Sequence, residues 1–310
     1  MHSTAHGLRS AREILVTGAT GFVGRRLVAS MGAGVTKLST REIGNTWAEA
    51  LRNKKCVVHL AARVHVMNDA SSDPLAEFRK ANVDGSLTLA SLAAQSGVKR
   101  FIFISSVKVN GEHTVIGKPF RASDEPAPQD PYGVSKMEAE AGLREIARQT
   151  GMEVVIIRPP LVYGPGVKAN FASMVKWLQR GVPLPLGAIH NQRSLVALDN
   201  LVDLIITCID HPAAANQTLM VSDGEDVSTT ELLQRMAAAL NVPARLIPVP
   251  QRAMEWGVAL LGKQALAQRL FSSLQVDSQP TRQLLGWTPP VSLDQGLSQV
   301  AAFVQHTHVN

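Results

Sequence analysis

The architecture of this chain follows from one run near its start, Glu13-Ile14-Leu15-Val16-Thr17-Gly18-Ala19-Thr20-Gly21-Phe22-Val23-Gly24. A short apolar segment that ends at a glycine is typical of a buried strand. Three glycines follow it at a spacing of three, and we expect a helix from Gly21 to Ala29. A strand, a glycine-rich turn and a helix N-terminus in this order suit a phosphate group, because the turn admits close backbone approach and the helix end offers free N–H groups. The alternative is a tight turn that needs glycine only for its backbone angles.

Further strands are expected wherever short apolar runs recur along the chain. They cover residues 35–39, 57–62, 100–105 and 153–158, and helices are expected between them, the longest over 74–96 and 131–150. Strands that alternate with helices indicate a parallel, doubly wound sheet with right-handed crossovers. The fold class is therefore α/β, with a Rossmann-like sheet.

The alternation loosens after Pro165, which divides the chain. We expect a flexible arm over residues 1–11 and a dinucleotide-binding domain over 12–165. A later segment near 193–222 is expected to return to that domain. Residues 166–310 are expected to form mainly a smaller C-terminal substrate-binding lobe.

Composition excludes several classes of function. The 310 residues carry a net charge of +6, but the basic residues are scattered and aromatics make up only 5%, so we expect no nucleic-acid partner and attribute the charge to an anionic small substrate. Cys56 and Cys208 form no Cys-x-x-Cys pattern, and the nine histidines show no metal spacing, so no metal is expected. No apolar run reaches the roughly 18 residues that span a bilayer. We therefore expect no membrane insertion and a reducing, cytoplasmic location.

The end of the second expected strand bears on the choice of cofactor. An acidic residue there would bind the ribose hydroxyl of NAD. The chain instead reads Val35-Thr36-Lys37-Leu38-Ser39-Thr40-Arg41. Arg41 suits a 2′-phosphate, and Arg25 follows the glycine turn directly. Ser39 and Thr40 suit either form, so the sequence favours NADP over NAD.

Three polar residues stand where a reaction would take place. Ser106, in Ser105-Ser106, follows an apolar strand, and ligands of open α/β sheets bind beyond the carboxyl ends of the strands. Tyr132 and Lys136 lie four residues apart and so share a helix face. A phenol beside a cation can exchange protons with a sugar hydroxyl or ketone. We expect Lys136 and an oxidised nicotinamide, both cationic, to lower the pKa of Tyr132.

Other candidates carry less weight. Asn82 is a poor helix former inside the expected helix 74–96, which indicates a specific hydrogen bond. The loop after Arg158-Pro159 is expected either to bracket the nicotinamide or to mark a domain boundary. Asn170 and Arg193 are candidates for binding a substrate diphosphate, since a guanidinium can make bidentate contacts.

Taken together, these motifs resemble the extended short-chain dehydrogenase/reductases, in the sugar-nucleotide epimerase/dehydratase family. The resemblance covers residues 13–300, and the motifs that carry it are Gly18-x-x-Gly21-x-x-Gly24, His59-Leu60-Ala61-Ala62, Ser106, Tyr132-x-x-x-Lys136, Arg158-Pro159, Tyr163-Gly164-Pro165-Gly166, Arg193 with Asp199, and Leu285-Gly286-Trp287-Thr288-Pro289. It implies a cytoplasmic homodimer that acts on a UDP-sugar.

The resemblance also implies roles for particular residues. Tyr132 would be the acid/base, Lys136 would orient the nicotinamide ribose, and Ser106 would hydrogen-bond the oxygen at C4 of the sugar. The remaining residues are assigned by position. Those expected to bind the cofactor are Gly18, Thr20, Gly21, Phe22, Val23, Gly24, Arg25, Ser39, Thr40, Arg41, Leu60, Ala61, Ala62, Asn82, Tyr132, Lys136 and Pro159. Those expected to bind the substrate are Ser106, Lys108, Asn170 and Arg193.

Departures from the family pattern lead to a choice of activity. The family's 4,6-dehydratases carry Asp-Glu after the serine, where this chain has Val107-Lys108. Its 4-epimerases usually read Val-Tyr-Gly where this chain reads Val109-Asn110-Gly111. With the missing strand-end acid, these departures fit an enzyme that consumes NAD(P)H. The stretches 130–136 and 183–191 resemble reductases of the C4 ketone of a UDP-4-keto-6-deoxy-N-acetylhexosamine, and this resemblance implies the formation of UDP-N-acetylquinovosamine for O-antigen. The alternatives are a UDP-hexose or UDP-N-acetylhexosamine 4-epimerase and a non-catalytic NADP-sensing scaffold.

Overall fold

The computed structural model describes residues 11–39, 45–64, 73–167, 169–254 and 270–307. Its main feature is a six-stranded parallel sheet of order β2-β1-β3-β4-β5-β8. The strands are β1 (Ile14–Thr17), β2 (Thr36–Leu38), β3 (Cys56–His59), β4 (Arg100–Ile104), β5 (Glu153–Arg158) and β8 (Thr218–Met220). The predicted Rossmann-like α/β fold is thus confirmed.

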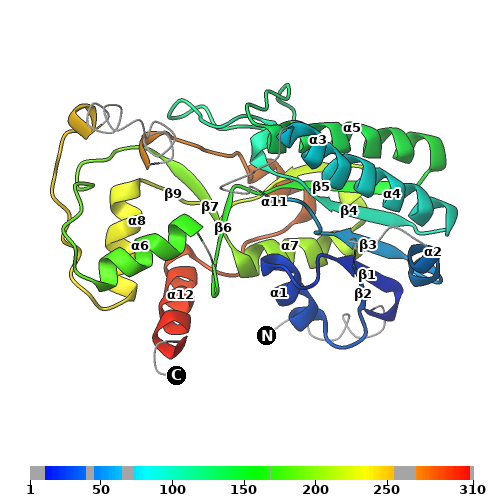
Figure 1. Ribbon diagram of the computed structural model, residues 1–310, viewed down its shortest axis with the longest axis horizontal. Helices are drawn as coiled ribbons and strands as arrows, with labels where there is room; N and C mark the ends of the chain where they lie inside the picture. Colours follow the sequence, from blue (N-terminus) through cyan, green and yellow to red (C-terminus); the bar gives the residue numbers. More distant parts are fainter. Residues whose placement is uncertain (1–10, 40–44, 65–72, 168, 255–269, 308–310) are drawn as a thin grey trace.

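Helices cover both faces of this sheet (Figure 1). One face packs against α2 (Asn45–Leu51), α4 (Gly85–Gln95) and α5 (Pro131–Thr150), around buried Trp47, Leu89, Phe101 and Leu143. The other face packs against α1 (Phe22–Met31), α7 (Leu198–Asp210) and α11 (Gln279–Leu285). The strands are buried from both sides, which explains why they read as unbroken apolar runs.

A smaller lobe is built around a second, three-stranded sheet. It contains β6 (Leu161–Tyr163), β7 (Arg193–Ala197) and β9 (Asp226–Val227), in the order β6-β7-β9. The helices α6 (Ala169–Gln179), α8 (Thr229–Ala239) and α12 (Leu293–Thr307) lie beside it (Figure 1). After β7 the chain returns to the main sheet through α7 and β8, whereas β7 itself stays in the small sheet. The domain limits drawn from the sequence stay predictions.

The helix predicted over 74–96 is interrupted. It consists of α3 (Pro74–Phe78), a π-helical turn over Arg79–Asp84, and α4. A π-helical turn inside a helix shifts the register of the side chains that follow and is common near functional sites. Asn82 lies in this turn and is 1% exposed.

No helix in the described part of the chain combines the length and the apolar character needed to cross a membrane.

Candidate active site

Helix α5 places Tyr132 and Lys136 against the carboxyl end of β4. Its first turn is fixed by Asp130, whose side chain accepts a hydrogen bond from the N–H of Gly133 at 2.6 Å, and Pro131 suits the first helical position. The short 3-10 helix over Val107–Val109 follows β4 and packs against α5. The elements that hold the expected catalytic residues therefore meet at one edge of the sheet.

The hydroxyl of Tyr132 is hydrogen-bonded to Ser106. Ser106 caps the 3-10 helix, because its Oγ accepts the N–H of Lys108 at 3.2 Å. Burial and the nearby charge of Asp130 raise the pKa of Tyr132 to about 12, while the bond from Ser106 opposes this rise. The pKa is thus raised, whereas we expected Lys136 to lower it, and Lys136 is not among the causes of the shift. A cation that stabilises the phenolate is needed before Tyr132 can serve as a base near neutral pH.

Lys136 is fully buried beside this pair. Its Nζ donates to the carbonyl oxygen of Ile104 at 2.8 Å and lies 4.2 Å from the centre of the Phe103 ring. Burial lowers the pKa of Lys136 to about 7, and the negative charge of Glu140 opposes this decrease. Lys136 therefore changes charge close to physiological pH.

The glycine turn has the geometry of a phosphate cradle. A Cβ on Gly24 would lie 2.1 Å from the carbonyl oxygen of Gly18, and one on Gly18 would lie 2.7 Å from the backbone N of Ala61. Close backbone packing thus requires glycine at both positions. Helix α1 begins here without a side-chain cap and without an acidic residue in its first turn. Its N-terminal amides suit an anion, so the turn fits the pyrophosphate of a dinucleotide.

His59, for which no individual role was predicted, links several elements beside the glycine turn. Its Nδ1 lies 2.7 Å from Thr17 Oγ1 and its Nε2 lies 2.9 Å from Ser86 Oγ. Thr17 Oγ1 also accepts the N–H of Ala61 at 3.2 Å. Burial lowers the pKa of His59 to about 3, with a smaller contribution from the charge of Lys136, so the ring is neutral. This chain of bonds fixes the segment that contains Ala61 beside the glycine turn.

Asn82 makes the specific hydrogen bonds that its place in a helix indicated. Its Oδ1 accepts the N–H of Arg63 at 2.8 Å, and its Nδ2 donates to the carbonyl of Arg63 and to Ser135 Oγ, both at 3.0 Å. The carbonyl of Pro159, in turn, accepts the N–H of Val107 at 3.0 Å. Both residues brace loops around the site, and a role in contacting the cofactor stays a prediction for each.

The predicted substrate residues are more scattered. The ammonium of Lys108 pairs with Asp130 and, at 3.0 Å, with Glu112. Arg193 begins β7 and donates to the carbonyl of Ser272 at 3.0 Å. Asn170 lies in α6, and its side chain is outside the described part of the structure, as are Thr40 and Arg41 of the predicted cofactor set.

Glu140 was missed by the sequence reasoning. It is 1% exposed, on the same face of α5 as Tyr132 and Lys136, and it accepts hydrogen bonds from Ser105 and Arg158. The spacing 132, 136 and 140 was the available signal, because residues four apart share a helix face.

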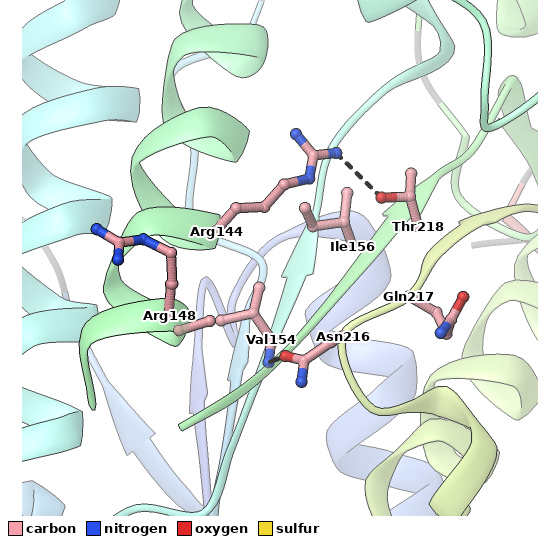
Figure 2. A pocket seen from close by; sticks show the side chains of 8 residues that line it. Arg144, Arg148, Val154, Ile156, Asn216, Gln217 and Thr218 are labelled. Atoms are coloured by element: carbon pink, nitrogen blue, oxygen red, sulfur yellow. Dashed lines mark hydrogen bonds between the residues drawn. The ribbon is translucent and has the colours of Figure 1, made fainter. Parts of the chain in front are cut away.

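A cavity of about 260 Å³ lies away from these residues (Figure 2). Arg144 and Arg148 of α5 line it, together with Val154 near the start of β5 and Thr218 at the start of β8. It therefore sits at the opposite end of these strands from the site, and we do not assign the reaction to it.

Among the described residues, no three His, Cys, Asp or Glu side chains gather in a way that could hold a metal ion.

The chain is also similar to known proteins. Residues 14–222 match the NAD dependent epimerase/dehydratase family. The chain is 49% identical to a UDP-glucose 4-epimerase of Vibrio cholerae, over 95% of this chain and 96% of that one. A GDP-6-deoxy-D-mannose reductase of Pseudomonas aeruginosa is 26% identical over 93% and 96% of the two chains. The structure of a UDP-glucose 4-epimerase of Thermotoga maritima with UDP-glucose shares the fold, with a TM-score of 0.76, 24% identity and coverage of 95% and 99%.

The prediction of a 4-keto reductase is wrong in the light of the Vibrio cholerae relative, which is named an epimerase. That prediction rested partly on Asn110. In the structure Asn110 is buried, accepts a bond from Arg158 at 3.0 Å and donates to the carbonyl of Arg121 at 2.8 Å. Asn110 thus serves the packing of its loop, and its departure from the family pattern does not indicate which reaction takes place. The glycine turn, the Tyr132–Lys136 pair and the family match agree in one conclusion: the chain belongs to the NAD dependent epimerase/dehydratase family.

Proposed function

We propose that this protein is a UDP-hexose 4-epimerase, which inverts the configuration at C4 of the sugar. The observation that carries the proposal is the hydrogen-bonded pair of Ser106 and Tyr132, beside Lys136, in a chain that is 49% identical to a UDP-glucose 4-epimerase. Inversion at C4 needs one group that takes a proton from the C4 hydroxyl and later returns it. The pair offers a phenol for that purpose.

Each residue of the site has a separate task in this proposal. Tyr132, as the phenolate, takes the proton of the C4 hydroxyl, and the same phenol returns it to the C4 oxygen when the C4–H bond forms again on the opposite face of the carbon. Ser106 hydrogen-bonds the oxygen at C4 and keeps it near the phenol. Burial and the charge of Asp130 raise the pKa of Tyr132. In the proposed reaction Lys136, as the ammonium, opposes this rise by stabilising the phenolate. Acid/base catalysis of this kind contributes roughly 100-fold to 10,000-fold in rate.

A nicotinamide dinucleotide fits the glycine turn and the uncapped N-terminus of α1. When bound, it supplies a reversible acceptor for the hydride at C4. Gly18, Gly21 and Gly24 would hold its pyrophosphate, and Lys136 its nicotinamide ribose. The lack of an acid from Val35 to Arg41 supports NADP over NAD. Mass spectrometry of the nucleotide released from denatured protein distinguishes the two.

The residues after Ser106 argue against a dehydratase. Val107 is 4% exposed and has no acid/base group, and the ammonium of Lys108 is held by Asp130 and Glu112. Neither side chain supplies the carboxyl group that elimination across C5 and C6 requires. A homodimer in the cytoplasm remains our expectation for the assembled enzyme.

The proposal is tested by incubating the purified protein with UDP-glucose, and separately with UDP-N-acetylglucosamine, without reductant. Chromatography of the products should show the corresponding C4 epimer, UDP-galactose or UDP-N-acetylgalactosamine. The product ratio should be the same when the reaction starts from either epimer. Absence of both conversions in protein shown to carry nucleotide would overturn the proposal, and the better of the two substrates identifies the sugar.

A further inference from the structure

Glu140 is a buried carboxylate at the back of the catalytic pair. It lies on α5 and is 1% exposed. Its Oε1 accepts from Ser105 Oγ at 2.6 Å and from Arg158 Nε at 2.9 Å, and its Oε2 accepts from a second nitrogen of Arg158 at 2.6 Å. Arg144 adds a further bond to Oε2 at 2.9 Å. Four hydrogen bonds, three of them from guanidinium groups, hold this carboxylate firmly in place.

The same helix face holds the end of β4 at successive residues. Lys136 donates to the carbonyl of Ile104, Glu140 accepts from Ser105, and the hydroxyl of Tyr132 bonds Ser106. Three positions of α5, spaced by four, thus bind three consecutive residues of the strand end. The middle contact, from Glu140, holds the residue directly before Ser106.

Glu140 also balances buried positive charge. Lys136 and Arg158 are 2% and 1% exposed, and an uncompensated buried cation is costly. The ionisable groups that face this region from α5 and the elements packed on it are His59, Lys108, Asp130, Tyr132, Lys136, Arg144 and Arg158. Asp130 and Glu112 are held by Lys108, whereas Glu140 opposes the decrease in the pKa of Lys136.

We propose that Glu140 is a positioning residue for the reaction: through Ser105 it fixes the strand end that carries Ser106, and its buried carboxylate lies on the same helix face as Lys136. This inference rests on the proposed function for its effect on turnover. A buried ion pair that only stabilises the fold is the competing explanation. The two differ in the titration of Lys136, which a purely structural pair with Arg158 would leave unchanged.

The test replaces Glu140 with glutamine, which keeps the size and removes the charge. Carbon-13 spectra of lysine-labelled protein, with the Lys136 signal assigned from Lys136→Met, give the titration of Lys136 whether or not the sugar reaction occurs. We expect Glu140→Gln to lower its midpoint by about one pH unit or more. The control, Glu145→Gln, removes a carboxylate of the same helix that is exposed and paired with Arg148, and should leave the midpoint unchanged.

Turnover gives the second readout. We expect Glu140→Gln to lower kcat about tenfold or more at pH 7 with little change in KM, because misplacement of a reacting group by about 1 Å costs up to 100-fold. The alkaline limb of its pH profile should move to lower pH. A folded variant with the wild-type Lys136 midpoint and an unmoved pH profile would overturn the inference, while absence of turnover in the wild type would overturn only the proposed function.

If Glu140→Gln does not fold, the variant Ser105→Ala tests the positioning role instead. This variant removes the bond to the strand end and leaves the pair of Glu140 with Arg158 intact. We expect its kcat to fall about fivefold or more at unchanged KM, since Ser106 loses its fixed position. A kcat equal to that of the wild type would overturn the inference.

Discussion

The side-chain Nζ of Lys136 donates a hydrogen bond to the carbonyl oxygen of Ile104 at 2.8 Å, which ties helix α5 to the last residue of β4. Two residues further along, the chain reaches Ser106, which is hydrogen-bonded to Tyr132. The carbonyl accepts a hydrogen bond from either the ammonium or the neutral amine, so the contact survives when Lys136 loses its charge. The ammonium form alone can stabilise the phenolate that the reaction needs.

Tyr132→Phe should reduce epimerisation by about 100-fold to 10,000-fold, because the variant has no group to exchange the C4 proton. The rate is measured by product chromatography at saturating substrate. Tyr163→Phe is the matched control, since the chain has two tyrosines and Tyr163 lies in the small lobe, bonded to Asp223 at 2.7 Å. It should lower stability and leave kcat near that of the wild type. Full activity in Tyr132→Phe would contradict the assignment.

Gly24→Ala should abolish nucleotide binding and destabilise the protein by about 1–3 kcal/mol or more, since its Cβ would lie 2.1 Å from the carbonyl oxygen of Gly18. Nucleotide content after purification and chemical denaturation measure the two effects. Gly85→Ala is the control, because the nearest atom to its Cβ would be 3.7 Å away and its backbone is helical. It should be neutral or slightly stabilising. Normal nucleotide content in Gly24→Ala would contradict the assignment of the glycine turn as the phosphate-binding site.

Stability should depend on pH through Lys136. Burial lowers its pKa to about 7 in the folded protein, while the unfolded chain keeps a pKa near 10.4. Between these values the unfolded state binds more protons, so this residue makes the free energy of unfolding rise as pH increases from about 7 to about 10. Denaturant unfolding at pH 7 and at pH 9 measures this change in the free energy of unfolding. Lys136→Met should flatten the rise, and an equal rise in that variant would assign the effect to other groups.

His59 should give a corresponding dependence in acid. Its pKa is lowered to about 3 by burial, against about 6.5 in the unfolded chain, so protonation of the unfolded state favours unfolding as pH falls below 6.5. His59→Gln removes this contribution while keeping a polar group near Thr17 and Ser86. We expect the variant to lose less stability than the wild type between pH 6.5 and pH 4. A steeper loss in the variant would show that His59 is not neutral in the fold.

Local patterns predicted much of the site. The glycine turn after β1 and the spacing of Tyr132 and Lys136 depend on residues close in sequence, so their geometry follows from the strand and the helix that carry them. A specific hydrogen bond of Asn82 was also predicted, because asparagine is a poor helix former inside a helix. The π-helical turn around it was not predicted, since one extra residue in a helix leaves no mark in the apolar pattern.

Contacts between residues far apart in the chain could not be predicted from the sequence. Glu140 meets Arg158 and Ser105 only after α5 packs on the sheet, and a glutamate in a helix otherwise suggests an exposed position. The prediction of a reductase rather than an epimerase was wrong for a different reason. Ser106, Tyr132 and Lys136 suit either reaction by their chemistry, and Asn110, the residue on which the choice partly rested, is used in packing.

The central claim is that hydride leaves C4 and returns to the same carbon within one active site, with Tyr132 moving the proton. The most direct measurement is conversion of UDP-glucose that carries deuterium at C4, followed by mass spectrometry and proton spectra of the product. Full retention of deuterium at C4 of UDP-galactose, with no consumption of added NADH or NADPH, is the expected result. Loss of the label to solvent, or one reduced cofactor consumed per turnover, would contradict the account.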